Sequence, residues 1–157
     1  MTKFDLSGSK VPRTKLKLPS KFNFATEVVV RVNDVNYAGH LSNDKVLSFI
    51  HEARVRHLNQ FGFTELEIDG VGSIMTEAVI VYKGEAFHGD VLKIEVATCD
   101  FHKYGCDYYY KLSNKATNKE IARAKTGIVF FDYEKRRMVE VPKKFITVCG
   151  QEIDSFS

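Results

Sequence analysis

One segment with helical periodicity stands in a chain whose other ordered segments have the pattern of strands, and this contrast constrains the fold most. Apolar positions recur in it at spacings of three and four, at Val46, Ile50, Ala53, His57 and Phe61. Ser42 or Asn43 can cap its first turn, where Asp44 also suits the positive end of a helix. Since Gly62 follows the last turn, the pattern predicts one long helix over residues 43–61.

The remaining ordered segments favour β-strands, because β-branched and aromatic residues are frequent in them. They are residues 24–32, 73–83, 91–102, 106–112 and 120–133, with shorter elements at 138–141 and 143–148. Runs of strands joined by short turns, with a single helix, indicate an α+β protein. We expect a curved antiparallel sheet of about five strands that wraps the helix. Residues 1–21 are predicted to form an extended arm, and residues 22–157 a single domain.

The composition argues against several other classes of protein. The net charge of +3 is too small to indicate nucleic-acid binding, and no apolar run approaches the roughly 18 residues of a membrane span. The lysine-rich first residues lack the apolar region of a signal peptide. The three cysteines, Cys99, Cys106 and Cys149, do not have the spacing of a zinc site. We therefore expect a cytoplasmic protein with reduced thiols and no metal.

The loop that precedes the helix, residues 33–44, is dense in groups that bind or transfer protons. Backbone N–H groups near Ser42, Asn43 and Asp44 are unpaired at a helix start and point toward this loop. Such a helix start suits an oxygen that must carry negative charge during a reaction. His40, within the loop, is a candidate base or hydrogen-bond donor because the ordinary pKa of histidine is near neutrality.

Several motifs in this chain occur in an order typical of one enzyme family. They lie at residues 30–36, 39–41, 43, 52–54, 82–90 and 130–132, followed by Pro142. Through them, residues 22–145 resemble the hotdog-fold acyl-CoA thioesterases, in particular the 4-hydroxybenzoyl-CoA thioesterase-like branch. The resemblance implies a hotdog fold that hydrolyses an acyl thioester of coenzyme A or of an acyl-carrier protein, without a cofactor. It also implies a homodimer or a dimer of dimers, with the active site at the subunit interface.

The chain departs from this family at one catalytic position. Family members carry an Asp-x-Asp pair in the loop, and their second aspartate acts as the nucleophile or as the base for water. The matching residue here is Asn36, and an amide cannot accept a proton at neutral pH. Asn36 can still orient a water molecule or hold the thioester oxygen through its amide N–H groups.

Three carboxylates are candidates for the missing base. Asp34 is nearest to it in sequence, although a structural role in bonding loop amides also suits this residue. Asp44 lies in the first helical turn, where it also suits stabilisation of the helix dipole. Glu52 lies two turns further on, and other hotdog branches place their catalytic acid on this helix. The alternative roles for Glu52 are an ion pair with Arg56 or a contact at the subunit interface. The predicted catalytic residues are therefore Asn36, His40, Asp34, Asp44 and Glu52.

The resemblance also assigns substrate binding to a further set of residues, namely Tyr37, Gly39, Ser42, Asn43 and Arg54. The predicted function is that of an acyl-CoA thioesterase. The alternative is a hotdog protein that binds acyl-CoA or a related ligand without cleaving it, because Asn36 replaces the working acid. A hotdog hydratase or dehydratase is a third reading, and it has less support because those enzymes pair a histidine with an acid in a different local motif.

Overall fold

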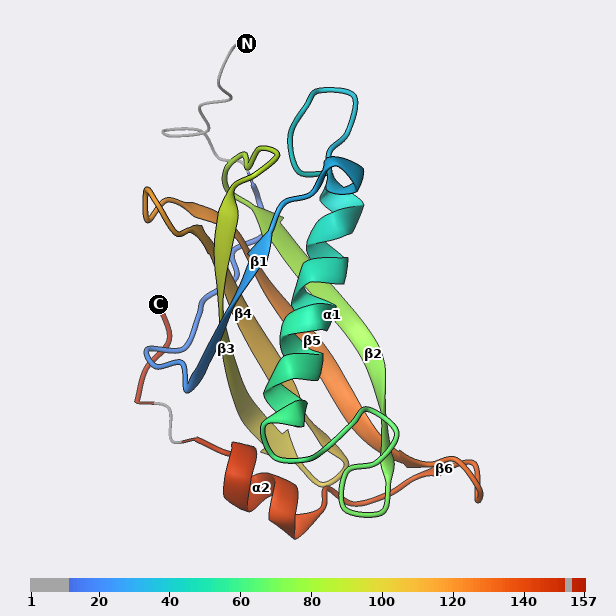
Figure 1. The fold of residues 1–157 in the computed structure, drawn as a ribbon. Coiled ribbons are helices and arrows are strands. Elements are labelled where there is room, and N and C mark those ends of the chain that lie inside the picture. Colours follow the sequence, from blue (N-terminus) through green and yellow to red (C-terminus); the bar gives the residue numbers. More distant parts are fainter. Residues whose placement is uncertain (1–11, 152–153) are drawn as a thin grey trace.

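The computed structural model describes residues 12–151 and 154–157. The order of its elements is β1 (Phe24–Val29), a 3₁₀ turn (Val32–Asp34), α1 (Asn43–Asn59), β2 (Gly72–Tyr82), β3 (Val91–His102), β4 (Gly105–Asn114), β5 (Glu120–Asp132), β6 (Arg137–Met138) and α2 (Lys143–Cys149). The strands form one antiparallel sheet in the order β1-β3-β4-β5-β2, and β6 pairs with the end of β5. Figure 1 shows the sheet curving around α1. The predicted α+β architecture is confirmed.

The main core lies between α1 and the inner face of the sheet. On the helix, Ile50 and Ala53 are fully buried, as the apolar periodicity predicts. Successive residues of a strand point to opposite faces, and β4 shows this in three consecutive tyrosines. Tyr108 and Tyr110 belong to the main core, whereas Tyr109 belongs to a second cluster on the outer face. Burial of each large apolar side chain contributes roughly 2 kcal/mol to this packing.

Several predicted boundaries and one predicted contact were wrong. The first strand ends at Val29 rather than at residue 32, because residues 32–34 turn into a 3₁₀ helix. The helix ends at Asn59, two residues before the predicted Phe61. Ser42 takes the N-cap position, but its hydroxyl makes no capping bond and donates to the carboxylate of Asp44 instead.

The two terminal segments that the structure describes run beside each other on the outer side of the sheet (Figure 1). Residues 1–11 of the predicted arm lie outside the described residues, and the boundary at residue 22 stays a prediction. The three cysteines are free thiols buried in the protein. In the described part of the chain, no helix is both long enough and apolar enough to cross a membrane.

Candidate functional site

A tight turn in the loop before α1 brings Asn36 and His40 together. The amide of Asn36 donates to the carbonyl of His40 at 3.0 Å, and the amide of Gly39 donates to the carbonyl of Asn36 at 2.9 Å. Gly39 has a φ of +81°, a backbone conformation that glycine adopts without a steric cost. The side-chain oxygen of Asn36 accepts the amide of Ala38 at 3.0 Å, so its NH₂ group faces outward from the turn as a donor. Tyr37, at the tip, is fully exposed.

His40 lies beside a carboxylate that the sequence analysis missed. Its Nε2 is 3.8 Å from Oε1 of Glu85, and both side chains are about one-quarter exposed, at 27% and 26%. The contact is fixed by the neighbouring backbone, since the amide of Leu41 donates to the carbonyl of Ala86 at 2.7 Å. Nδ1 of His40 lies 3.3 Å from the carbonyl oxygen of Leu41, which accepts a hydrogen bond when Nδ1 carries a proton.

The start of α1 adjoins this turn and carries Ser42, Asn43 and Asp44. The hydrogen bond from the Ser42 hydroxyl lowers the pKa of Asp44, which therefore stays ionised at neutral pH. Among the described residues, the amide of Asn43 donates to no carbonyl or side chain, so it is an available donor at the helix start. The hydroxyl of Tyr82, at the end of β2, donates to the carbonyl of Asn43 at 2.9 Å and ties this strand to the helix start.

Asp34 is buried, with only 1% of its surface exposed, and its carboxylate is occupied by Arg31. The backbone amide of Arg31 donates to it at 2.8 Å, and Nε of the same residue donates at 3.2 Å. Burial alone would raise the pKa of Asp34, but these bonds outweigh it and hold the pKa below its usual value. The carbonyl of Asp34 accepts the amide of Ser42 at 2.8 Å, so the residue holds the loop in shape.

Glu52 lies apart from this group. Its carboxylate pairs with Nε of Arg56 at 2.7 Å, the i+4 contact considered for it from the sequence. It lines a cleft of about 440 Å³ between β1 and α1, together with Glu27, Val28, Val29, Arg31, Ser48, Phe49 and Arg56. Glu85 instead lines a second cleft of about 280 Å³, together with Phe87, Asp90, Asn114, Thr117, Lys119 and Ile121.

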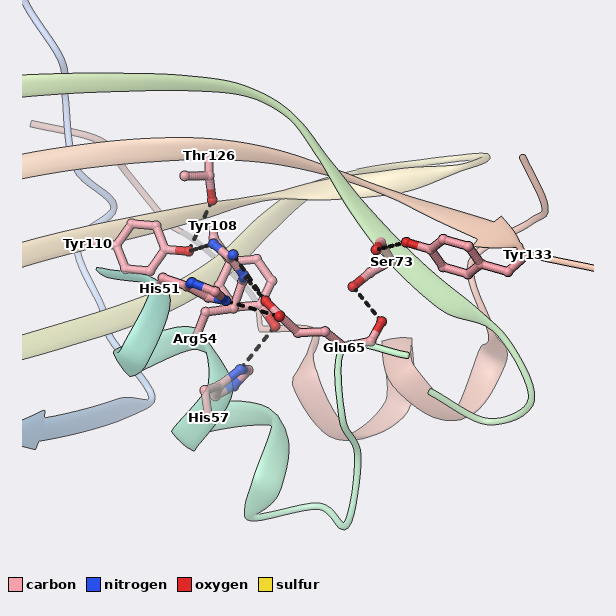
Figure 2. A network of polar contacts seen from close by, with 9 residues as sticks. All are labelled: His51, Arg54, His57, Glu65, Ser73, Tyr108, Tyr110, Thr126 and Tyr133. Atoms are coloured by element: carbon pink, nitrogen blue, oxygen red, sulfur yellow. Dashed lines mark hydrogen bonds and ion pairs between the residues drawn. The ribbon is translucent and has the colours of Figure 1, made fainter. Parts of the chain in front are cut away.

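Arg54 lies in a buried polar network and is only 8% exposed (Figure 2). Its Nε and Nη2 donate to one carboxylate oxygen of Glu65 at 3.2 and 3.1 Å, and its Nη1 donates to the hydroxyl of Tyr110 at 3.2 Å. Burial alone would raise the pKa of Glu65, but contacts with His51 and Arg54 outweigh it and keep this pKa low. The guanidinium is thus engaged inside the protein, and its predicted role in substrate binding stays a prediction.

The structure therefore brings together two of the five predicted catalytic residues, Asn36 and His40, and places Glu85 beside His40. Asp44 lies at the adjoining helix start, while Asp34 and Glu52 are held by neighbouring arginines. A sequence signal for Glu85 existed, because it is the first acid after β2 within the motif at residues 82–90. In the described part of the chain, no three histidine, cysteine or acidic side chains form a group that could hold a metal ion.

Comparisons with known proteins give one family and one fold. A family model described as the thioesterase-like superfamily matches residues 30–147. The chain is similar to the crystal structure of a 1,4-dihydroxy-2-naphthoyl-CoA thioesterase from Synechocystis, with 21% identity and a TM-score of 0.73 over 79% of this chain and 93% of that chain. No curated protein sequence matches the chain significantly.

Two further solved structures agree with this fold. A mutant of 4-hydroxybenzoyl-CoA thioesterase, complexed with 4-hydroxybenzoyl-CoA, has 20% identity and a TM-score of 0.72 over 80% of this chain and 97% of that chain. The probable thioesterase YbaW from Escherichia coli has 17% identity and a TM-score of 0.70 over 83% of this chain and 98% of that chain. The predicted hotdog fold is confirmed by these likenesses.

Proposed function

Since the chain belongs to the thioesterase-like superfamily, we propose that it hydrolyses an acyl thioester, with His40 as the base and Glu85 as its partner. The observation that carries this proposal is the 3.8 Å approach between Nε2 of His40 and Oε1 of Glu85, beside the turn that holds Asn36. A carboxylate next to an imidazole stabilises the imidazolium that forms when the ring accepts a proton. This pair supplies the proton acceptor that Asn36 cannot be.

In the proposed reaction, Nε2 of His40 removes a proton from water as the water oxygen attacks the thioester carbonyl carbon. The carbonyl oxygen becomes an oxyanion, and we assign its stabilisation to the amide of Asn43 and the side-chain NH₂ of Asn36. When the carbonyl re-forms, the carbon–sulfur bond breaks. The thiolate leaves with the proton that His40 had taken, and the products are a free acid and a thiol.

The proposed substrate is a coenzyme A thioester. Two of the similar structures are thioesterases of aromatic acyl-CoA compounds, a 1,4-dihydroxy-2-naphthoyl-CoA and a 4-hydroxybenzoyl-CoA enzyme, and this supports the same class of thiol carrier here. We also propose that the chain works as a homodimer, in which the second copy binds at the edge of β2. This strand ends the sheet order and leaves one long edge open to another strand, with Met75 exposed on it.

The test is thiol release from aromatic, short and long acyl-CoA compounds by the wild-type protein and three variants. His40→Ala and Glu85→Gln should each lower kcat/KM at least about 100-fold, which is the usual contribution of a positioned base. Glu52→Gln is the matched control and should stay near wild type, because Glu52 pairs with Arg56. Wild-type turnover that survives in His40→Ala would contradict the assignment of the base.

A second candidate is a protein that binds acyl-CoA without hydrolysing it. The observation that favours it is Asn36 itself, since its side-chain oxygen is occupied by the amide of Ala38 in the position where relatives carry an acid. Asn36→Asp would keep that hydrogen bond and add a carboxylate. If the wild-type protein binds acyl-CoA in calorimetry but releases no thiol, and Asn36→Asp begins to release it, this second candidate holds. Asn33→Asp, in the same loop, is the control.

A further inference from the structure

The second cleft, which is lined by Glu85, lies between two loops at one end of the sheet. One loop crosses from β2 to β3, and the other is the turn between β4 and β5 (Figure 1). Backbone hydrogen bonds hold both loops in place. The amide of Gly84 donates to the carbonyl of Ile121 on β5 at 3.0 Å, and the amide of Lys115 donates to the carbonyl of Val91 on β3 at 2.9 Å. The walls of the cleft are therefore fixed before a ligand binds.

The wall formed by the β4–β5 turn presents hydrogen-bond donors and one positive charge. Oδ1 of Asn114 is occupied by the amides of Ala116 and Thr117, at 2.9 and 3.3 Å. Oγ1 of Thr117 accepts the amide of Lys119 at 3.3 Å, so the NH₂ group of Asn114 and the hydroxyl hydrogen of Thr117 remain as donors. Within the described part of the chain, the ammonium of Lys119 makes no ion pair or hydrogen bond. This wall suits a carboxylate or another anion.

The wall formed by the β2–β3 loop presents carboxylates and an aromatic ring. One oxygen of Asp90 accepts the amide of Phe87 at 2.8 Å, and its other oxygen has no partner among the described residues. The charged neighbour of Glu85 is His40, and their 3.8 Å separation is longer than a hydrogen bond. The ring of Phe87 is 38% exposed. This wall suits a cation, because carboxylates and the face of an aromatic ring both attract one.

The charges of the cleft restrict the ligand that fits it. Its lining contains two carboxylates, of Glu85 and Asp90, and one ammonium, of Lys119. A plain anion would meet two like charges, while a plain cation would leave Lys119 unpaired. A molecule that carries both charges satisfies both walls. Pockets for drug-sized ligands have volumes of roughly 300–1,000 Å³, so a cleft of about 280 Å³ suits a smaller molecule.

From these observations we propose that the cleft binds a small zwitterion of the amino-acid type. Its ammonium binds the carboxylates of Glu85 and Asp90, beside the ring of Phe87. Its carboxylate binds Lys119 and the free donors of the β4–β5 turn. The binding goes beyond the proposed hydrolysis and does not depend on it, because Glu85 is the one residue of this lining that the proposed reaction uses.

Occupation of the cleft has a consequence that rests on the proposed function. Glu85 lines the cleft and also lies beside His40. A bound ammonium therefore competes with the imidazolium of His40 for the same carboxylate, and the base loses stabilisation of its charged form. The zwitterion is then an inhibitor of thiol release.

The binding test titrates the isotope-labelled protein with three four-carbon probes at constant ionic strength and follows its amide resonances by NMR. The probes are 4-aminobutyrate, which carries both charges, butyrate, which carries only the anion, and butylammonium, which carries only the cation. We expect 4-aminobutyrate to shift the amides of Phe87, Thr117 and Lys119. Its Kd should be about tenfold or more below that of either other probe, because each of these lacks one set of charged hydrogen bonds.

Two variants locate the site. Lys119→Met removes an exposed ammonium and should raise the Kd of 4-aminobutyrate about tenfold, toward that of butylammonium. Lys115→Met is the matched control in the same turn, because the ammonium of Lys115 pairs with Glu27 at 2.8 Å, and it should leave the Kd unchanged. Equally tight binding of butyrate or butylammonium, equal losses in both variants, or an absence of shifts in the cleft amides overturns the proposal.

Thiol release from an acyl-CoA, measured with the same probes, tests the consequence. Saturating 4-aminobutyrate should lower kcat/KM of the wild type roughly tenfold, which is part of the loss expected for Glu85→Gln, and Lys119→Met should escape this inhibition. Binding without inhibition confirms the site and overturns the competition for Glu85. A wild-type protein that releases no thiol contradicts the proposed hydrolysis instead, and the titration then decides the site alone.

Discussion

His57 on α1 faces Tyr108 on β4 in the middle of the core, with Nδ1 3.1 Å from the phenol oxygen (Figure 2). The imidazole is completely buried, and the rings of Phe24, Phe61 and Tyr108 lie around it with centroids 5.4 to 5.5 Å away. Among the described residues, its Nε2 has no hydrogen-bond partner. Burial lowers the pKa of His57 to about 4, so the ring is neutral at pH 7.

This burial makes the stability of the fold depend on pH. The unfolded chain binds a proton at His57 near the ordinary pKa of about 6.5, whereas the folded chain binds it only near pH 4, so stability falls as the pH drops between these values. From pH 7 to pH 5 the loss should be about 2 kcal/mol, measured by urea unfolding. His57→Phe should abolish this difference, and His88→Gln, at an exposed position, should leave it unchanged. If His57→Phe lost as much stability between pH 7 and pH 5 as the wild type, the pH dependence would come from another group.

The fork that Arg54 presents to Glu65 should be intolerant even of lysine. A lysine keeps the charge but presents its donors from one nitrogen, which cannot contact Glu65 and Tyr110 as the two arms of the guanidinium do, so one of these acceptors loses a partner. Arg54→Lys should lower the free energy of unfolding by about 2 kcal/mol. Arg137→Lys, at an exposed position in β6, should change it by less than about 0.5 kcal/mol. Similar losses in both variants would show that burial of Arg54 is unimportant.

The carboxylate of Asp34 should stabilise the loop at neutral pH but not in acid. Its pKa in the folded protein lies below the usual value, so its contribution is present at pH 7 and is lost as the pH falls from about 4 through the folded pKa. Asp34→Asn should therefore cost roughly 1 to 2 kcal/mol at pH 7 and much less in acid. Unfolding curves at several pH values test this, with the exposed Asp69→Asn as the control.

Alanine variants of Gly39 and Gly62 distinguish the effect of a turn on stability from its effect on activity. Both have a positive φ, of +81° and +75°, so an added Cβ should cost about 1 kcal/mol at either position. Only Gly39 lies in the turn that joins Asn36 to His40. Gly39→Ala should lower thiol release about tenfold, since small shifts of catalytic groups have large effects, while Gly62→Ala should lower stability alone. Equal thiol release by the two variants would show that the turn of Gly39 is not part of the active site.

The fold could be predicted from the sequence because its signals are local. The stripe that contains Ile50 and Ala53 fixes the helix, and the runs that became β3 and β5 are long and rich in β-branched residues. The 3₁₀ turn at residues 32–34 was missed because Asp34 folds back on Arg31, a contact that β-propensity does not report.

The candidate site was predictable only where its contacts are local. Asn36 and His40 lie within one turn, so their proximity follows from sequence spacing. Glu85 comes from a distant part of the chain, and its approach to His40 depends on the pairing of Leu41 with Ala86. In the same way, the burial of Arg54 depends on Glu65 and Tyr110, which only the folded sheet brings to it.

The strand order has a consequence for how the chain is made. β1 pairs with β3 and β2 pairs with β5, so the first half of the chain contains no pair of adjacent strands. During synthesis, β1, α1 and β2 leave the ribosome before the strands that cover them. Their apolar faces stay exposed until β5, which ends at Asp132, has emerged. The β3–β4–β5 meander can form at once from neighbouring hairpins. We therefore expect this late segment to nucleate folding and the earliest segment to dock last, which makes the nascent chain a natural client for chaperones.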